Sequence, residues 1–161
     1  MSERRNSREA NDEQNVKTFV AERWTLEYDL AYSGMALELL VAARLAAHDD
    51  AIHAARETHD QVIERAMTEY EGLVSSGISA EETSSTIYAL FHRKVASKAI
   101  TAQYLVDILE QRFQTLGVSL ERLEERLPAY LVEAIYYVTS RIEITPNQHQ
   151  PTEQQTQGQM P

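Results

Sequence analysis

The stretch from residue 48 to residue 60, HDDAIHAARETHD, concentrates side chains that bind metal ions or exchange protons. It contains three histidines, His48, His53 and His59, together with four acidic residues. On a helix, two ligands converge when they lie three or four residues apart, whereas these histidines are five, six and eleven residues apart. A continuous helix therefore does not bring them to one face, and we predict no metal site and no bound cofactor.

His59 differs from the other two histidines because it falls on an apolar stripe, with Val62 and Ala66 following at helical spacing. This position predicts a side chain that points into the fold, as a core or boundary residue. A second interpretation is a pH-sensitive residue, since burial or a nearby acid moves the pKa of an imidazole across the physiological range. A contact with a ligand is the third interpretation.

The segment FHRKVASK, residues 91 to 98, is the one dense basic patch in a chain with a formal net charge of −10. It contains Arg93, Lys94 and Lys98, and a continuous helix places the two lysines one turn apart. These residues either pair with acidic side chains of neighbouring helices or dock an acidic partner or a phosphate group. General nucleic-acid binding is disfavoured, because so acidic a chain repels phosphate at long range.

Tyrosines gather just after Pro128 and form a second candidate surface. Tyr130 and Tyr137 are seven residues apart and share a helix face, with Tyr136 one residue off it. Tyrosine is favoured at interfaces because it buries a ring and keeps a polar tip. This face either fills the core or binds a partner or a second subunit. Trp24, the only tryptophan, falls on the first apolar stripe and is predicted to anchor the core.

Both ends of the chain lack the apolar periodicity of a folded element. Residues 1–15 are almost wholly polar, and residues 145–161 are rich in Gln, Pro and Thr. Such segments bury too little surface to offset the entropy of ordering them. The sequence therefore predicts disordered tails on both sides of one helical domain, residues 16–144.

Within that domain, apolar residues recur at the helical period and no strand pattern competes. Caps, glycines and the phase of the stripes predict four helices: one ending near residues 48–50, one ending at Gly72 or Gly77, one from Ser79 to Gly117, and one from Ser119 to residue 142. A single unbroken helix over residues 17–74 is an alternative to the first two. Short loops predict an all-α, antiparallel four-helix bundle with helices of roughly 25 to 37 residues.

Pro128 lies inside the last predicted helix. The apolar stripe passes through it in unchanged phase, which favours one helix kinked at Pro128, since proline removes a hydrogen bond and clashes one turn back. A break at Leu127, with Pro128 as the first residue of a new helix, stays open.

Composition excludes several kinds of site. The chain has no cysteine, so disulfides, thiolate metal sites and a cysteine nucleophile are excluded, and a reducing cytoplasm is the expected location. No apolar segment follows the N-terminal charges, so no signal peptide is expected. The most apolar run, residues 34–47, contains Glu38 and Arg44 and is shorter than the roughly twenty residues of a membrane span. We predict a buried helix and no membrane contact.

No nucleotide-binding loop, nucleophile elbow or dinucleotide fingerprint is present. The sequence predicts a non-enzymatic helical protein that binds a protein partner or itself, as a homo-oligomer or a subunit of a larger assembly. Size and composition suit an assembly or adaptor protein encoded by a virus or a mobile element.

Two other functions stay open at this stage. One is a regulator of nucleic-acid machinery, acting through residues 92–98 or through an acidic surface that mimics nucleic acid. The other is a metal-dependent enzyme of ferritin-like shape, which needs a Glu-x-x-His pair on two helices. The nearest match is the single Asp50 to His53 spacing.

Overall fold

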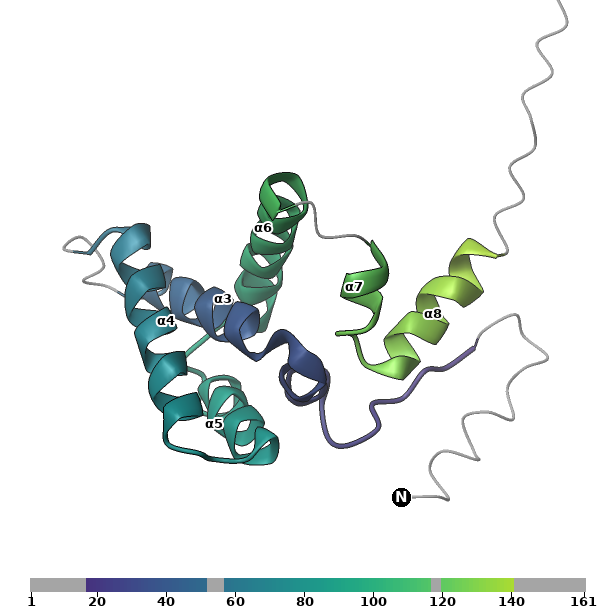
Figure 1. Ribbon diagram of the computed structural model, residues 1–161, viewed down its shortest axis with the longest axis horizontal. Coiled ribbons are helices and arrows are strands. Elements are labelled where there is room, and N and C mark those ends of the chain that lie inside the picture. Colours follow the sequence, from purple (N-terminus) through teal and green to yellow (C-terminus); the bar gives the residue numbers. More distant parts are fainter. Residues whose placement is uncertain (1–16, 52–56, 117–119, 141–161) are drawn as a thin grey trace, which may run out of the picture.

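The computed structural model describes residues 17–51, 57–116 and 120–140 (Figure 1). Over these ranges the protein contains helices and no strand, which confirms the all-α class. In chain order the elements are α2 (Leu26–Leu30), a wide turn η2 (Ala31–Met35), α3 (Ala36–Asp49), α4 (His59–Ser75), α5 (Ala80–His92), α6 (Lys98–Leu116), α7 (Leu120–Glu124) and α8 (Ala129–Thr139). The predicted tails, residues 1–15 and 145–161, lie outside the described residues.

Helix α3 lies at the centre and packs against α4, α5 and α6 (Figure 1). Its sequence is apolar on most sides, which is typical of a helix buried by several neighbours. One core cluster joins η2 and α3 to α5, with Met35, Leu40 and Ile87 at most 1% exposed. A second cluster joins α3 to α4 through Leu45 and Val62. Both core clusters therefore include residues of this one helix.

The prediction of a single helix from Ser79 to Gly117 is wrong, because the chain leaves the helix after α5. The Val95 amide donates to the Leu90 carbonyl at 2.8 Å, and the Lys94 amide donates to the Phe91 carbonyl at 3.1 Å. These two bonds form a Schellman motif, which ends a helix. Lys94 has φ +56°, the left-handed conformation that glycine usually supplies at this position. Helices of 25 residues or more are absent from the described part of the chain.

The last predicted helix is also divided rather than kinked. Helix α7 ends at Glu124 and α8 begins at Ala129, with Pro128 in extended conformation (φ −56°, ψ 138°) immediately before α8. The carbonyl of Pro128 accepts from the amides of Leu131 and Val132 at 2.9 and 3.3 Å. Proline fits there because the start of a helix needs no donor from it. The structure is thus close to the alternative in which the helix breaks at residue 127.

The first apolar stripe begins outside any helix. Residues 22–24 bend around the buried carboxylate of Asp29, which accepts their three amides at 2.8 to 3.4 Å. These bonds replace those of a continuing helix, so the helical chain starts only at Leu26. Trp24 is 61% exposed and its ring lies 4.8 Å from that of Tyr88. The expectation that Trp24 anchors the core is therefore wrong.

The segment Leu26–Asp49 is long and apolar enough to cross a membrane by length and composition alone. This is weak support for a membrane span, because most of its apolar window is buried inside the fold, as in the core helix of a soluble protein. Gly34, with φ +115°, interrupts the helix, and the segment carries the buried acids Asp29 and Glu38. We interpret the segment as the core of the helical domain.

Glu38 connects this core to the C-terminal helices. Its side chain is 0% exposed, and its Oε1 atom accepts from the guanidinium groups of Arg112 in α6 and Arg126 after α7. Arg126 lies 2.7 Å from Glu38 and also donates to the carbonyl of Gly34 in η2, at 3.0 Å from its Nε. One buried carboxylate therefore fixes the position of three segments that are distant in sequence.

Candidate functional site

Helix α8 exposes an apolar face at the edge of the molecule. Its sequence, AYLVEAIYYVT, contains one charged residue, Glu133. Ile135 and Val138 are 52% and 59% exposed, and Tyr136 is exposed beside them. Figure 1 places α8 far from α4. A helix that is apolar on most sides is normally buried, so this face is typical of a surface that binds another helix.

Other residues of α8 already pack against the chain itself. Tyr130 is buried, and Leu131 packs against the main core cluster. The ring of Tyr137 contacts Phe19 edge-to-face at 5.7 Å between centroids. The exposed residues Ile135 and Val138 follow Leu131 by four and seven residues and share its side of the helix. This side of α8 is therefore packed at Leu131 and exposed at Ile135 and Val138.

The apolar stripe through the last predicted helix includes Val138, and the burial that it predicts there is wrong, since Val138 is 59% exposed. Leu131, seven residues earlier on the same side of α8, packs against the core as the stripe predicts. The exposure of Ile135 and Val138 was missed because helical spacing predicts which residues share a face and not whether a neighbour covers it. The near absence of charge from residues 129–139 is the signal in the sequence that could have revealed it.

The two tyrosines predicted to bind a partner differ in position. Tyr137 is half-buried against Phe19, at the border of the exposed face. Tyr130 is 8% exposed and fills the core, so its ring is not offered to a partner. Burial and the nearby charges of Asp29 and Glu27 raise the pKa of Tyr130 to about 12. Its buried hydroxyl has no hydrogen-bond partner among the described residues.

We expect Tyr130→Phe to leave the free energy of unfolding unchanged or to raise it by up to about 1 kcal/mol, because an unpaired buried hydroxyl contributes a desolvation penalty and no bond. Urea unfolding followed by circular dichroism measures this change. Tyr130→Ala is the control and should be destabilising by about 3 kcal/mol, since it removes the whole ring. Loss of more than about 1 kcal/mol in the phenylalanine variant would show that the hydroxyl is bonded.

The predicted basic patch is divided between two elements. Arg93 and Lys94 are exposed in the connection between α5 and α6, and Lys98 is the first residue of α6. Nζ of Lys98 lies 2.8 Å from Oε1 of Glu27. Burial alone raises the pKa of Glu27, but the hydrogen bond and charge of Lys98 bring it below its usual value. The lysines therefore do not share a helix face, and one of them pairs within the chain.

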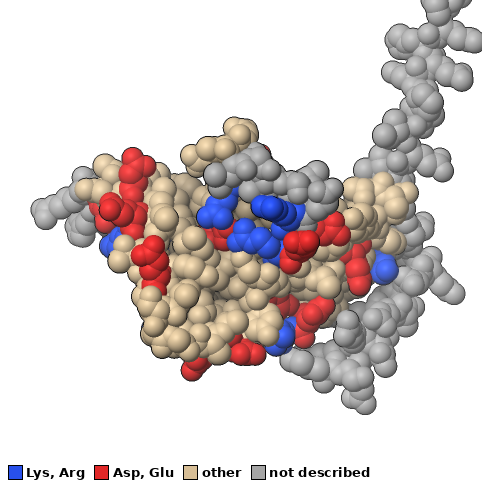
Figure 2. Space-filling model, viewed as in Figure 1, with Lys and Arg blue, Asp and Glu red and all other residues tan. Residues whose placement is uncertain are grey.

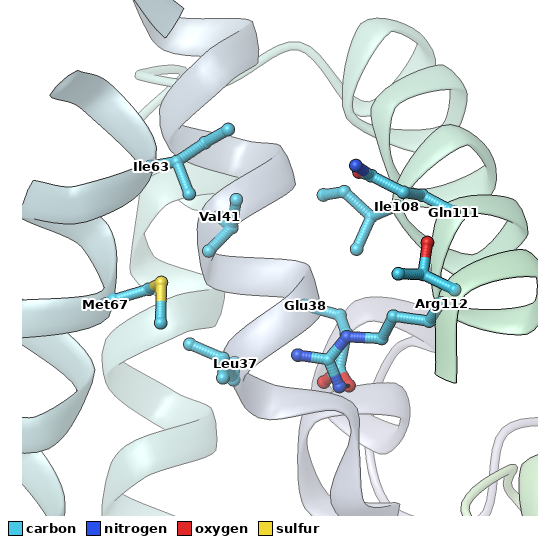
Figure 3. Close-up of a pocket in the computed structure, with 9 residues that line it drawn as sticks. Leu37, Glu38, Val41, Ile63, Met67, Ile108, Gln111 and Arg112 are labelled. Atoms are coloured by element: carbon cyan, nitrogen blue, oxygen red, sulfur yellow. Dashed lines mark hydrogen bonds and ion pairs between the residues drawn. The ribbon is translucent and has the colours of Figure 1, made fainter. Parts of the chain in front are cut away.

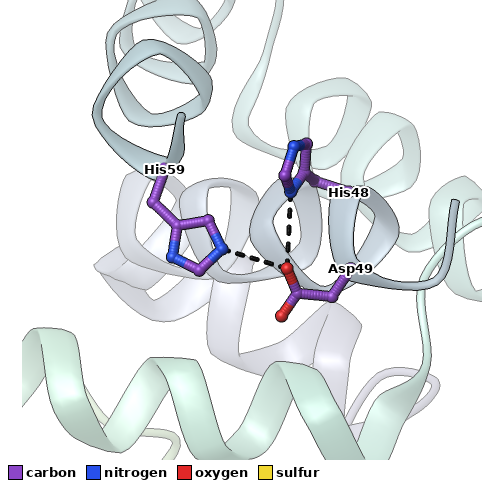
Figure 4. Close-up of side chains that lie close together, drawn as sticks. All are labelled: His48, Asp49 and His59. Carbon is purple, nitrogen blue, oxygen red and sulfur yellow. Dashed lines mark hydrogen bonds and ion pairs between the residues drawn. The ribbon is translucent and has the colours of Figure 1, made fainter. Parts of the chain in front are cut away.

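The histidine-rich stretch is divided between two helices, with His48 at the end of α3, His59 at the start of α4, and His53 outside the described residues. His48 and Asp49 end α3, while His59 begins α4, so the two histidines face the same carboxylate (Figure 4). Oδ1 of Asp49 lies 3.3 Å from Nδ1 of His48 and 3.0 Å from Nε2 of His59. The expectation that His59 points into the core is wrong, because it is exposed at the start of a helix capped by Thr58.

Tyr104 of α6 completes this cluster by donating its hydroxyl to Oδ2 of Asp49. That hydrogen bond, followed by those from His59 and His48, lowers the pKa of Asp49 to about 2. The same bond raises the pKa of Tyr104 to about 12. At neutral pH the cluster therefore holds an ionised carboxylate between one phenolic donor and two imidazoles. Such a set can bind a cation.

A partly open cavity of about 290 Å³ lies between α3, α4 and α6 (Figure 3). Its lining consists of Leu37, Glu38, Val41, Ile63, Met67, Ile108, Gln111, Arg112 and Thr115. Most of these side chains are apolar, and the carboxylate in the lining, Glu38, is engaged by Arg112. The cavity thus suits an apolar side chain or a small apolar molecule.

No protein-family model, curated protein or solved structure matches this chain. Function is therefore inferred from geometry alone. Packing within the chain leaves the exposed face of α8 and the cluster around Asp49 without an explanation.

Proposed function

We propose that the chain is a non-enzymatic assembly protein that forms a homodimer through α8. The observation that supports this function is the apolar outer face of α8, with Ile135 and Val138 more than half exposed. In a two-fold dimer the same face of each copy covers the other, so one self-complementary patch is sufficient. The two α8 helices then complete a shared helical bundle in the cytoplasm.

A second copy is favoured over a charged partner because this face carries so little charge. With a net charge of −10, two copies repel each other at long range. Acidic side chains gather over α4 in Figure 2, whereas α8 contributes only Glu133. Pairing through α8 therefore brings fewer like charges together than pairing through α4. Because salt screens the remaining repulsion, dimerisation should strengthen as ionic strength rises.

Replacing Ile135 and Val138 together by glutamate should weaken self-association at least about tenfold, because each new carboxylate must lose its hydration in the interface. Light scattering on the full chain over a dilution series measures the effect. The wild-type chain is expected to be a dimer that dissociates on dilution, and the variant a monomer. Circular dichroism should be unchanged, since both side chains face solvent in one copy.

Matched controls come from valines of similar exposure on other helices. Val74→Glu in α4 and Val106→Glu in α6 change residues that are 56% and 53% exposed. Both variants should dimerise like the wild type. A wild-type monomer at every concentration, or equal loss of dimer in the control variants, would exclude pairing through α8.

The alternative of a regulator that contacts phosphate through residues 92–98 has less support. Lys98 pairs with Glu27, and Lys94 lies in a connection rather than on the helix face predicted for both lysines. Binding to DNA or RNA that weakens steeply with salt would favour this alternative, because each phosphate contact releases counterions.

A further inference from the structure

The cluster at the junction of α3 and α4 has the dimensions of a metal site, a property separate from the proposed dimerisation. His48, Asp49 and His59 each offer one ligand atom, and these three atoms lie within 4.8 Å of one another. Two of the separations are 3.3 and 3.0 Å. Tetrahedral zinc with bonds of about 2.1 Å places its ligand atoms about 3.4 Å apart. His59 is exposed, so its ring can turn to adjust the third separation.

Backbone contacts orient His48 as a ligand. Its Nε2 atom lies 3.0 Å from the carbonyl oxygen of Glu57. A carbonyl oxygen only accepts, so Nε2 carries the proton, and in the neutral ring the lone pair is on Nδ1. That atom is the one that faces Asp49. Histidines that bind metals commonly donate their other ring N–H to a carbonyl in this way.

Asp49 is held in a matching orientation. Its Oδ2 atom accepts from Tyr104, which leaves Oδ1 directed toward the two imidazoles. With Nε2 donating to Glu57, the contact from Nδ1 to Oδ1 is a hydrogen bond only when the ring carries a second proton. A divalent cation between the three atoms can take the place of that proton and attract every ligand. Tyr104 then acts as the outer hydrogen-bond partner that orients a ligating carboxylate.

We propose that His48, Asp49 and His59 bind one Zn²⁺ ion, with water as the fourth ligand. Two imidazoles and one carboxylate suit zinc, whereas Mg²⁺ and Ca²⁺ prefer ligand sets made of oxygen. The ion joins the end of α3 to the start of α4, so its binding stabilises the folded chain. The site lies at helix ends, unlike the interior site of a ferritin-like bundle.

The test uses the full chain without an affinity tag, stripped with a chelator and then loaded with zinc sulfate. After desalting, elemental analysis should find one zinc per chain. At a hundredfold excess of free zinc over Kd, the Tm should rise by about 5 to 10 °C. His59→Ala should lower zinc affinity at least about a hundredfold and abolish the rise in Tm. The Tm of its metal-free form should change little, because His59 is exposed.

Two further variants distinguish loss of the zinc ligands from a general effect on folding. His92→Ala removes an exposed histidine at the end of α5 and should retain wild-type zinc binding. Asp49→Asn keeps an acceptor for Tyr104 but removes the charge, and should weaken zinc binding at least about tenfold. A wild-type chain that retains no zinc overturns the proposal. Undiminished zinc affinity in His59→Ala also overturns it.

Discussion

Replacing both Arg112 and Arg126 by alanine should lower the free energy of unfolding by about 3 to 5 kcal/mol. The Glu38 side chain is 0% exposed, and these two guanidinium groups are its ion-pair partners. Each single replacement leaves one cation in place and should be destabilising by about 1 kcal/mol, since both arginines are partly exposed. The double replacement leaves the buried carboxylate of Glu38 without a cation. Its effect on the free energy of unfolding should therefore exceed the sum of the two single effects by about 1 to 3 kcal/mol.

A double-mutant cycle in urea, followed by circular dichroism, measures this coupling. Adding Glu38→Met to the double variant should recover most of the lost stability, because the buried charge is then absent. Arg65→Ala is the control, since Arg65 pairs with Glu57 at the surface, and its effect should stay below about 1 kcal/mol. Effects of the two arginines that are small and additive would contradict a buried, ionised Glu38.

The helical period of the apolar residues and the helix caps predicted the helical class and much of the core. Leu39, Ile87 and Phe91 are among the apolar residues that recur at the helical period, and they are buried. The predicted helix start at Ser79 is also confirmed by a capping box: the Ser79 amide donates to Oε2 of Glu82 at 2.9 Å, and the Ser79 hydroxyl accepts from the amide of Glu82 at 3.2 Å. These features depend on residues within one or two turns, so a linear sequence contains them.

The helix ends were predicted less well, because they depend on residues that depart from the usual pattern. The Schellman motif after α5 has Lys94 where glycine is usual, so no breaker residue marks it in the sequence. Ser97, whose hydroxyl is 3.5 Å from the amide of Ile100, was the available signal for a new helix. The bend at residues 22–24 depends on the buried acid Asp29. The apolar stripe considers apolar residues only, so it could not predict that this acid is buried.

The cluster around Asp49 was not predicted because helical spacing says nothing about residues on opposite sides of a turn. On one continuous helix, the separation of eleven residues between His48 and His59 would keep the two rings apart. In the structure His59 begins α4 and lies beside the end of α3, with 5.5 Å between the centroids of the two rings. Tyr104 reaches the same carboxylate from α6. Contacts of this kind become visible only once the packing of α3, α4 and α6 is known.

Gly34→Ala should be destabilising by about 1 to 3 kcal/mol, because a side chain strains the backbone at φ +115°. Space is not the cause, since an added Cβ would lie 3.7 Å from Cγ of Arg126, an ordinary contact. The carbonyl of Gly34 also accepts from Arg126. Any change of this turn therefore disturbs the bond that connects η2 to the segment before α8. Urea unfolding of the variant and the wild type measures the effect.

Gly72→Ala provides a control with the same chemical change and the opposite sign. Gly72 lies within α4, and an added Cβ there meets nothing within 4 Å. Alanine should stabilise this helix by about 0.5 to 1 kcal/mol, because it reduces the conformational freedom of the unfolded chain. Stabilisation by alanine at both positions would show that Gly34 does not hold the turn. If alanine is destabilising at Gly34 and stabilising at Gly72, the break between α2 and α3 depends on the backbone conformation of Gly34. That conformation allows Arg126 to reach both η2 and Glu38.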